Sequence, residues 1–258
     1  MMLPLDQEAP LSEDNLIGLI PAAGKGSRLG LPFPKELYPT IINDQYKPIA
    51  HYMVDHLTIA AVRHIVFVIN ESKHQLIKYF GGGHKFNCNI SYVAQETLSD
   101  KPSSSPGLAN ALASAYHLIK DKTVLFGMAD TIMWPKEAFT TALSKLDQQT
   151  DVLLMLFPTE FPHKFGMVSF NEALEVEKII DKPKETDLKY MWGAMIWRPP
   201  FSEILYSKVA QNESSDFADI INFSIKEGLL VKAEVFADGK FVDFGTYEQI
   251  HDAESIEF

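Results

Sequence analysis

Two hydrophobic patterns alternate along the first 160 residues of the chain. Short hydrophobic runs, such as VLFGMA and VLLMLF, suit strands that are buried on both faces of a sheet. They predict strands over 16–21, 64–70, 90–95, 123–129 and 151–157. Between them, hydrophobic positions recur at helical spacing and predict helices over 48–61, 73–80, 108–120 and 135–146. This alternation is typical of an α/β fold with a doubly wound, mostly parallel sheet and helices on both faces.

The remainder of the chain is richer in strand patterns. The segments FGMVSF, LEVEKIID, YMWGAMIW and VKAEVFADGKFVDF predict further strands, which would make the sheet mixed. Helices are predicted over 200–210, 216–227 and 247–256. Because no long linker interrupts the chain, we expect a single domain over 15–258, with halves over 15–160 and 161–258. Residues 1–14 contain prolines and acidic residues and are predicted to form a flexible arm.

The charge balance narrows the choice of partners. The chain has 23 Lys and Arg against 34 Asp and Glu, a net charge of −11. This charge repels phosphate backbones and anionic lipids, so we expect neither nucleic acid nor a membrane as a partner. The hydrophobic runs are also far shorter than the ~20 residues that span a bilayer, and no secretory signal is recognisable. The single cysteine, Cys88, cannot form an internal disulfide and suits the cytoplasm, where we expect the protein.

The segment IGLIPAAGKGSRLGLPFPKEL connects a predicted buried strand to a loop of small residues. Four of them leave the backbone bare enough for its N–H groups to approach phosphate oxygens, namely Ala22, Ala23, Gly24 and Gly26. Arg28 can bind such oxygens through its planar fork, and Lys35 supplies a point charge. The glycine spacing matches neither the dinucleotide-binding G-x-G-x-x-G motif nor the Walker A loop. The segment therefore predicts a polyanion site of another kind.

This loop resembles the phosphate-binding segment of the sugar-1-phosphate nucleotidylyltransferases, of the glucose-1-phosphate thymidylyltransferase and uridylyltransferase kind. Further segments resemble the same family in the same order along the chain: YVAQ, PGLANAL, LFGMAD, FGMVSF, DKP and FVDFGT. Together they cover about residues 16–247. The resemblance implies the Rossmann-like architecture of nucleotide-diphospho-sugar transferases.

The resemblance also implies an activity and a set of site residues. The activity is nucleotidyl transfer from a nucleoside triphosphate, dTTP or UTP, to a sugar 1-phosphate, with release of pyrophosphate and with Mg²⁺ as cofactor. The implied catalytic residues are Arg28, Lys35 and Lys182. The implied nucleotide-binding residues are Ala22, Ala23, Gly24, Gly26, Gln95 and Gly107. The implied sugar-phosphate-binding residues are Gly166, Asp181 and Gly193, and the implied metal ligands are Asp130 and Asp243. At Asp181 the family usually has Glu, whose reach is one methylene longer.

Two other functions share part of this sequence evidence. The PAAGKGSR opening also resembles cytidylyltransferases that act on an alcohol phosphate, either methylerythritol phosphate or choline phosphate. No segment like their D-A-x-R-P follows the fourth predicted strand, whereas D-K-P and D-x-G-T favour sugar phosphates. A non-catalytic nucleotide-binding domain is the third interpretation, and it has little need for two metal carboxylates. A homo-oligomer is compatible with the sequence.

Overall fold

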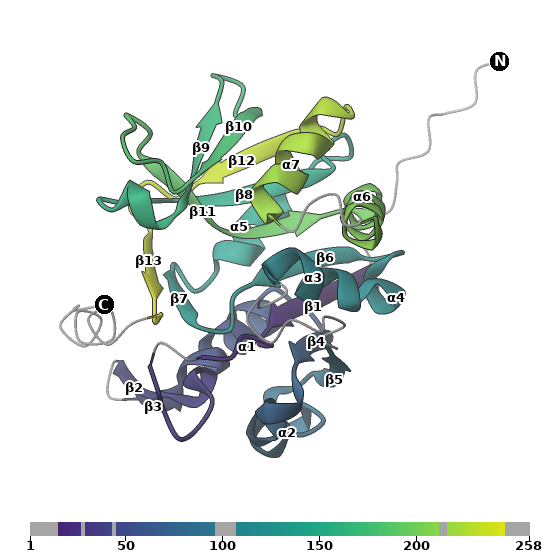
Figure 1. Cartoon of the computed structure of the whole chain (residues 1–258), viewed down its shortest axis with the longest axis vertical. Coiled ribbons are helices and arrows are strands. Elements are labelled where there is room, and N and C mark those ends of the chain that lie inside the picture. The colour runs from purple at the N-terminus through teal and green to yellow at the C-terminus, as the bar shows by residue number, and fades with distance from the viewer. Residues whose placement is uncertain (1–14, 27–28, 43–44, 96–106, 212–215, 246–258) are drawn as a thin grey trace.

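The computed structural model describes residues 15–26, 29–42, 45–95, 107–211 and 216–245. Its main sheet has nine strands, and seven of them follow one another across the sheet (Figure 1). In spatial order these are β10 (Val176–Asp181), β9 (Gly166–Phe170), β11 (Tyr190–Trp197), β6 (Thr123–Gly127), β1 (Leu16–Pro21), β4 (His64–Ile69) and β5 (Asn89–Ala94). The other two branch from β11, namely β8 (Val152–Pro158) and β12 (Val231–Val235).

Parallel and antiparallel pairs occupy different parts of this sheet. β6, β1, β4 and β5 pair in parallel, as β8 and β12 do. β11 is antiparallel to β6, β8 and β9, and β9 is antiparallel to β10. The sheet is therefore mixed, as the strand-rich second half of the sequence predicted.

Helices cover both faces of the sheet because side chains on its strands alternate in direction. On β1, Ile20 belongs to the hydrophobic cluster under α1 (Ile49–Ile59), α2 (His74–Phe80) and α5 (Ala138–Lys145). Its neighbour Leu19 belongs to the cluster on the opposite face. There the helices are α3 (Gly107–Ser114), α4 (Tyr116–Ile119), α6 (Pro199–Ala210) and α7 (Phe217–Lys226). Both residues are fully buried, and the predicted α/β architecture is confirmed.

Two small antiparallel ribbons lie outside the main sheet. One joins β2 (Pro39–Ile42) to β3 (Gln45–Pro48), and the other joins β7 (Thr131–Trp134) to β13 (Lys240–Asp243). No strand was predicted from the sequence for β2, β3 or β7. The segment VKAEVFADGKFVDF was predicted to form strand, but its two parts, β12 and β13, belong to different sheets. In Figure 1, β13 runs alongside β7, away from β12.

Most predicted elements form within two residues of their expected ends. An exception is α5, which begins at Ala138 although its helix was expected from residue 135. The helix expected over 108–120 is interrupted at Ala115, whose N–H bonds to the Leu112 carbonyl in a tighter turn, at 3.1 Å. α4 then turns toward α6, where Tyr116 stacks on Tyr206 with ring centroids 4.1 Å apart. Lys73 does not begin α2 but ends the short 3₁₀ helix η3 (Glu71–Lys73). The arm over 1–14 and the helix over 247–256 lie outside the described residues.

Cys88 is buried and forms no internal disulfide, because the sequence has no second cysteine. No helix in the described part of the chain combines the length and hydropathy that crossing a bilayer demands.

Candidate active site

The loop of small residues leaves the carboxyl end of β1, in the parallel part of the sheet. Ala22 extends the strand pairing, because its N–H bonds to the Val68 carbonyl at 2.7 Å. Gly26 has a φ of +64°, a left-handed conformation that favours glycine, and a Cβ on Gly24 would meet open space. Asn70, which follows β4, donates its side-chain amide to the Ala23 carbonyl at 2.5 Å. The loop is thus held from the neighbouring strand while its glycines stay bare.

Lys35 connects this loop to the end of β6. It begins the 3₁₀ helix η2 (Lys35–Leu37), and a Cβ on Gly26 would lie 3.9 Å from Lys35 Cγ, so the lysine stem passes beside the loop. The Lys35 ammonium donates a hydrogen bond to Asp130 Oδ2. The side chains of Lys35 and Asp130 are only 18% and 12% exposed, which strengthens their attraction.

The β7–β13 ribbon places Asp243 near Lys35 and Asp130. In the ribbon register, Asp243 lies opposite Thr131, the residue that follows Asp130. The next amide, that of Phe244, donates to the Asp130 carbonyl at 2.9 Å. Phe244 is buried in a small cluster with Ile49 of α1 and other residues, which anchors the end of the ribbon. Two aspartates far apart in sequence therefore lie near the same end of the ribbon, and both carboxylates act on the charge of Lys35.

The charges around Lys35 keep it protonated. Burial acts to lower the pKa of its ammonium, but the carboxylates of Asp130, Glu36 and Asp243 outweigh burial and raise that pKa above its usual value. The ammonium therefore remains a cation throughout the neutral range. A fixed positive charge beside bare backbone is suited to hold phosphate oxygens.

The two carboxylates fit a divalent cation. Asp130 and Asp243 both act on a positive charge already present, that of Lys35, and carboxylate oxygens are the ligands that Mg²⁺ prefers. No group of three or more potential ligands gathers anywhere in the part of the chain that the structure describes. The protein would therefore supply two ligands, and water and substrate phosphates would complete the coordination.

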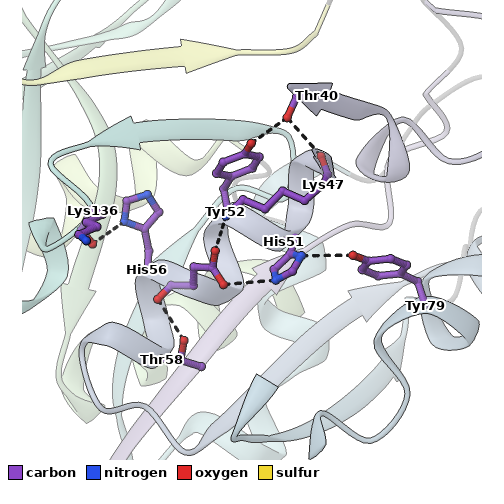
Figure 2. A network of polar contacts seen from close by, with 9 residues as sticks. Thr40, Lys47, His51, Tyr52, His56, Thr58, Tyr79 and Lys136 are labelled. Carbon is purple, nitrogen blue, oxygen red and sulfur yellow. Dashed lines mark hydrogen bonds and ion pairs between the residues drawn. The ribbon is translucent and has the colours of Figure 1, made fainter. Parts of the chain in front are cut away.

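Helix α1 supports both ribbons through the polar contacts in Figure 2. Tyr52 accepts a hydrogen bond from Thr40 of β2 at 3.0 Å, and Asp55 pairs with Lys47 of β3 at 2.5 Å. On another side of the helix, His56 Nδ1 donates to the carbonyl of Lys136, just beyond β7, at 2.9 Å. α1 thus links the hairpin that follows Lys35 to the segment that follows Asp130.

We expect His56 to make the folded protein less stable as the pH is lowered. Its side chain is 3% exposed, and burial lowers its pKa below the usual value despite the hydrogen bond to Lys136. Below about pH 6.5 the unfolded chain therefore binds a proton that the folded protein does not bind. The free energy of unfolding then decreases by up to ~1.4 kcal/mol for each unit by which the pH is lowered. Urea unfolding of His56→Gln should show a shallower pH dependence than the unchanged protein.

The matched control for this measurement is His117→Gln, because His117 is exposed on α4. Its pH dependence should equal that of the unchanged protein. An equal slope for His56→Gln would contradict the assignment of the effect to His56.

Two of the residues predicted to bind the nucleotide, Gln95 and Gly107, lie just beyond β5 and at the start of α3. Gln95 follows β5, and its N–H bonds to the Ile69 carbonyl at 2.7 Å. Among the described residues, its side-chain Nε2 is buried without a hydrogen-bond partner. Gly107 has a φ of +74° and begins α3, which packs on β1 and β4. The segment between Gln95 and Gly107 lies outside the described residues, as does Arg28.

The residues predicted to bind the sugar phosphate lie on or just beyond β9, β10 and β11. Lys182 follows β10, and its side chain is 62% exposed with its ammonium 3.2 Å from Asp181 Oδ2. Asp181 lies opposite Gly166 in the β9–β10 register. In the sheet, β9 and β11 lie between β10 and β6. The hydrogen bonds described for Lys182 and for Lys35 do not connect the two lysines, so their joint role stays a prediction.

The two glycines of this group have close neighbours of their own. A Cβ on Gly166 would lie 2.4 Å from Trp192 Nε1, and one on Gly193 would lie 2.5 Å from the Phe241 ring. Gly193 also sits where the β11–β8 register shifts. Side-chain packing and a strand irregularity thus explain why glycine occurs at both positions. Their contact with a sugar stays a prediction.

Sequence reasoning missed three polar residues near the loop: Glu36, Asn70 and Lys73. Asn70 caps η3, accepting from the Ser72 N–H at 2.9 Å. An Asn between a strand and the polar residues Glu-Ser-Lys is a recognisable turn signal. Glu36 and Lys73 form a buried ion pair, and nothing in the sequence indicates that they meet.

Comparisons with known proteins find related sequences and a similar fold. Glucose-1-phosphate thymidylyltransferase of Neisseria meningitidis serogroup A is 25% identical over 246 residues, which cover 93% of this chain and 81% of that protein. UTP–glucose-1-phosphate uridylyltransferase of Haemophilus ducreyi is 21% identical over 217 residues, which cover 69% and 73%. The crystal structure of a UDP-glucose pyrophosphorylase complexed with UDP-glucose is similar with a TM-score of 0.75 at 22% identity, covering 92% of this chain and 96% of that one.

At this identity the structural similarity concerns the fold, and it confirms the architecture that the sequence motifs implied. The sequence model of the nucleotidyl transferase family matches residues 17–257, from the strand before the phosphate-binding loop to beyond Asp243. Because that match spans almost the whole chain, the protein belongs to the nucleotidyl transferase family.

Proposed function

We propose that this protein transfers a nucleotidyl group from a nucleoside triphosphate to a sugar 1-phosphate and releases pyrophosphate. The observation that carries the proposal is the position of Lys35, whose stem passes Gly26 of the bare loop and whose ammonium binds Asp130. Asp243 lies at the same end of the ribbon. A fixed cation, bare N–H groups and two carboxylates are what a metal-bound triphosphate requires.

The reaction needs no protein nucleophile. An oxygen of the sugar 1-phosphate attacks the α-phosphorus of the triphosphate, and the bond from that phosphorus to the leaving pyrophosphate breaks. Catalysis then depends on alignment and on neutralising negative charge. Backbone N–H groups of the loop would bind phosphate oxygens, with Arg28 and Lys35 supplying positive charge. Lys182 would guide the sugar phosphate toward the triphosphate.

Asp130 and Asp243 would hold Mg²⁺ in this scheme. The cation supplies further neutralisation of the phosphate charge when it is bound. The side chains around it keep their own tasks: Lys35 orients Asp130, and the ribbon fixes Asp243 relative to it.

For the substrates, we propose dTTP or UTP as donor and a hexose 1-phosphate as acceptor. The relatives named above act on glucose 1-phosphate with thymidylyl or uridylyl donors. The buried amide of Gln95 supports a base contact, because an unpaired donor of this kind is suited to a carbonyl oxygen of a bound base. The net charge of −11 argues against nucleic-acid and membrane partners, and the single cysteine suits the cytoplasm.

A substrate panel tests this function directly. dTTP, UTP, CTP, ATP and GTP are each combined with several hexose 1-phosphates, methylerythritol phosphate and choline phosphate, and pyrophosphate release is measured with Mg²⁺ and with EDTA. We expect Mg²⁺-dependent release only with a hexose 1-phosphate and dTTP or UTP, with the nucleotide sugar identified by mass spectrometry. Release confined to CTP with an alcohol phosphate would overturn the proposal in favour of a cytidylyltransferase.

Two controls make a negative or weak result interpretable. Asp130→Asn, purified in parallel, shows whether a contaminating enzyme produces the signal. Equilibrium binding of each triphosphate, measured with Mg²⁺, is the second control. Tight triphosphate binding without pyrophosphate release from any pair would replace the proposed enzyme with a nucleotide-binding domain.

A further inference from the structure

A fully buried ion pair lies next to the site and takes no part in the chemistry proposed above. The Lys73 ammonium donates to both oxygens of Glu36, at 2.8 and 2.7 Å. The side chains of Lys73 and Glu36 are only 3% and 2% exposed. Charged residues are rarely buried this completely, and such pairs contribute little net stability because removing both charges from water is costly. Stability alone is therefore a weak reason for the pair.

The pair joins the two segments that frame the proposed triphosphate site. Glu36 follows Lys35 directly in η2, while Lys73 ends η3 beyond β4. Asn70 caps η3 and also donates to the Ala23 carbonyl of the loop at 2.5 Å. One continuous set of contacts thus leads from the loop through Asn70 and Lys73 to Glu36, and from there to Lys35.

Glu36 is also a competitor of Asp130. Both carboxylates attract the Lys35 ammonium, and Glu36 and Asp130 are close enough for the charge of one to affect the other. Lys35 can direct its ammonium toward Asp130 because the oxygens of Glu36 are already bound by Lys73. Without Lys73, the buried Glu36 would lose the ammonium that binds both of its oxygens, and the Lys35 ammonium, which already interacts with Glu36, would be drawn toward it.

We propose that Lys73 is a positioning residue: by binding both oxygens of Glu36, it leaves the Lys35 ammonium to Asp130 and to the incoming triphosphate. The expected effect on turnover rests on the proposed function. The expected position of the Lys35 ammonium, bound to Asp130 and not to Glu36, does not depend on that function. According to this proposal, the position of the Lys35 ammonium depends on the neutralisation of Glu36 and not on the charge of Lys73 itself.

The kinetic test compares Lys73→Met with the double variant Glu36→Gln/Lys73→Met. We expect kcat of the folded Lys73→Met protein to fall about 30-fold, as for other residues that orient a catalytic group. Removing the Glu36 charge in the double variant should restore kcat to within about threefold of the unchanged protein, because a neutral Gln no longer attracts Lys35. Lys73→Arg keeps a bidentate partner for Glu36 and should retain activity.

The matched control is Lys232→Met, which breaks the ion pair with Asp147 (2.8 Å) at the β8–β12 side of the sheet and should leave kcat unchanged. The folded fraction is measured by circular dichroism at the assay temperature, so that lost stability is not read as lost turnover. A Lys73→Met protein that is less stable but has normal kcat would reduce the pair to a structural role. A low kcat that the double variant fails to restore would also overturn the proposal.

A crystal structure of Lys73→Met tests the geometry without any substrate. We expect the Lys35 ammonium to bind Glu36 instead of Asp130. A lysine still bound to Asp130 would contradict the inference, even if the substrate panel had failed. Where Lys73→Met does not fold, Lys73→Gln takes its place: it should lower kcat about fivefold, with recovery when Glu36→Gln is added. Unchanged kcat in Lys73→Gln would count against the proposal.

Discussion

Asp130→Asn should lower kcat/KM by about 10³-fold, the scale of losing one charged contact to the reacting phosphates. The substitution preserves shape but removes the negative charge that binds the Lys35 ammonium. It also removes one of two carboxylates that would hold Mg²⁺, so the Mg²⁺ concentration required for half-maximal rate should rise. Initial rates of pyrophosphate release over a Mg²⁺ titration measure both effects.

Asp238→Asn is the matched control, because Asp238 is exposed in the turn between β12 and β13. It changes the same charge on the same chain without approaching Lys35, and its rates should equal those of the unchanged protein. If Asp130→Asn retained near-normal rates with an unchanged Mg²⁺ requirement, Asp130 would have to be removed from the site.

Lys35→Met should reduce kcat by about 100-fold, with a smaller change in KM, because charge on the transferred phosphate is greatest in the transition state. Methionine has a similar length, so the space beside Gly26 stays filled. The variant should also gain a new dependence of stability on Mg²⁺. Without the ammonium, the carboxylates of Asp130 and Asp243 repel each other, and a bound divalent cation relieves that repulsion.

Thermal unfolding with and without Mg²⁺ measures this second effect. We expect Mg²⁺ to raise the melting temperature of Lys35→Met more than that of the unchanged protein. Lys136→Met serves as the control, since the Lys136 side chain is 72% exposed and pairs only loosely with Glu137, at 3.7 Å. Equal Mg²⁺ responses in Lys35→Met and the unchanged protein would argue that Asp130 and Asp243 do not share a cation.

The helices and strands that could be predicted from the sequence are those with a clear hydrophobic pattern. β1 coincides with its predicted bounds because its hydrophobic run is buried on both faces and ends where the small residues begin. β7 was missed because it has only four residues, Thr131–Trp134, between the strand predicted to end at 129 and the helix predicted from 135. β2 and β3 are short and contain Pro and polar residues, so neither has a clear strand pattern.

In the candidate site too, some residues could be identified from the sequence and others could not. Asp130 and Lys35 were identified from motifs, and the structure brings them together. The ion pair of Glu36 with Lys73 depends on how the tertiary fold brings η2 close to η3. In the sequence, each of the two residues resembles an ordinary charged surface residue. The resemblance also implied a catalytic role for Lys182. That role stays a prediction, because the described contacts of Lys182 are with Asp181 and not with Lys35 or Asp130.

The β7–β13 ribbon also determines when this protein can become active during its synthesis. Asp130 emerges from the ribosome 113 residues before Asp243, which belongs to the last described strand. Domains generally begin to fold from the N-terminus while the chain is still growing. A nascent chain could therefore form β1, β4 and the loop of small residues early, yet it would lack the second carboxylate until β13 has been synthesised.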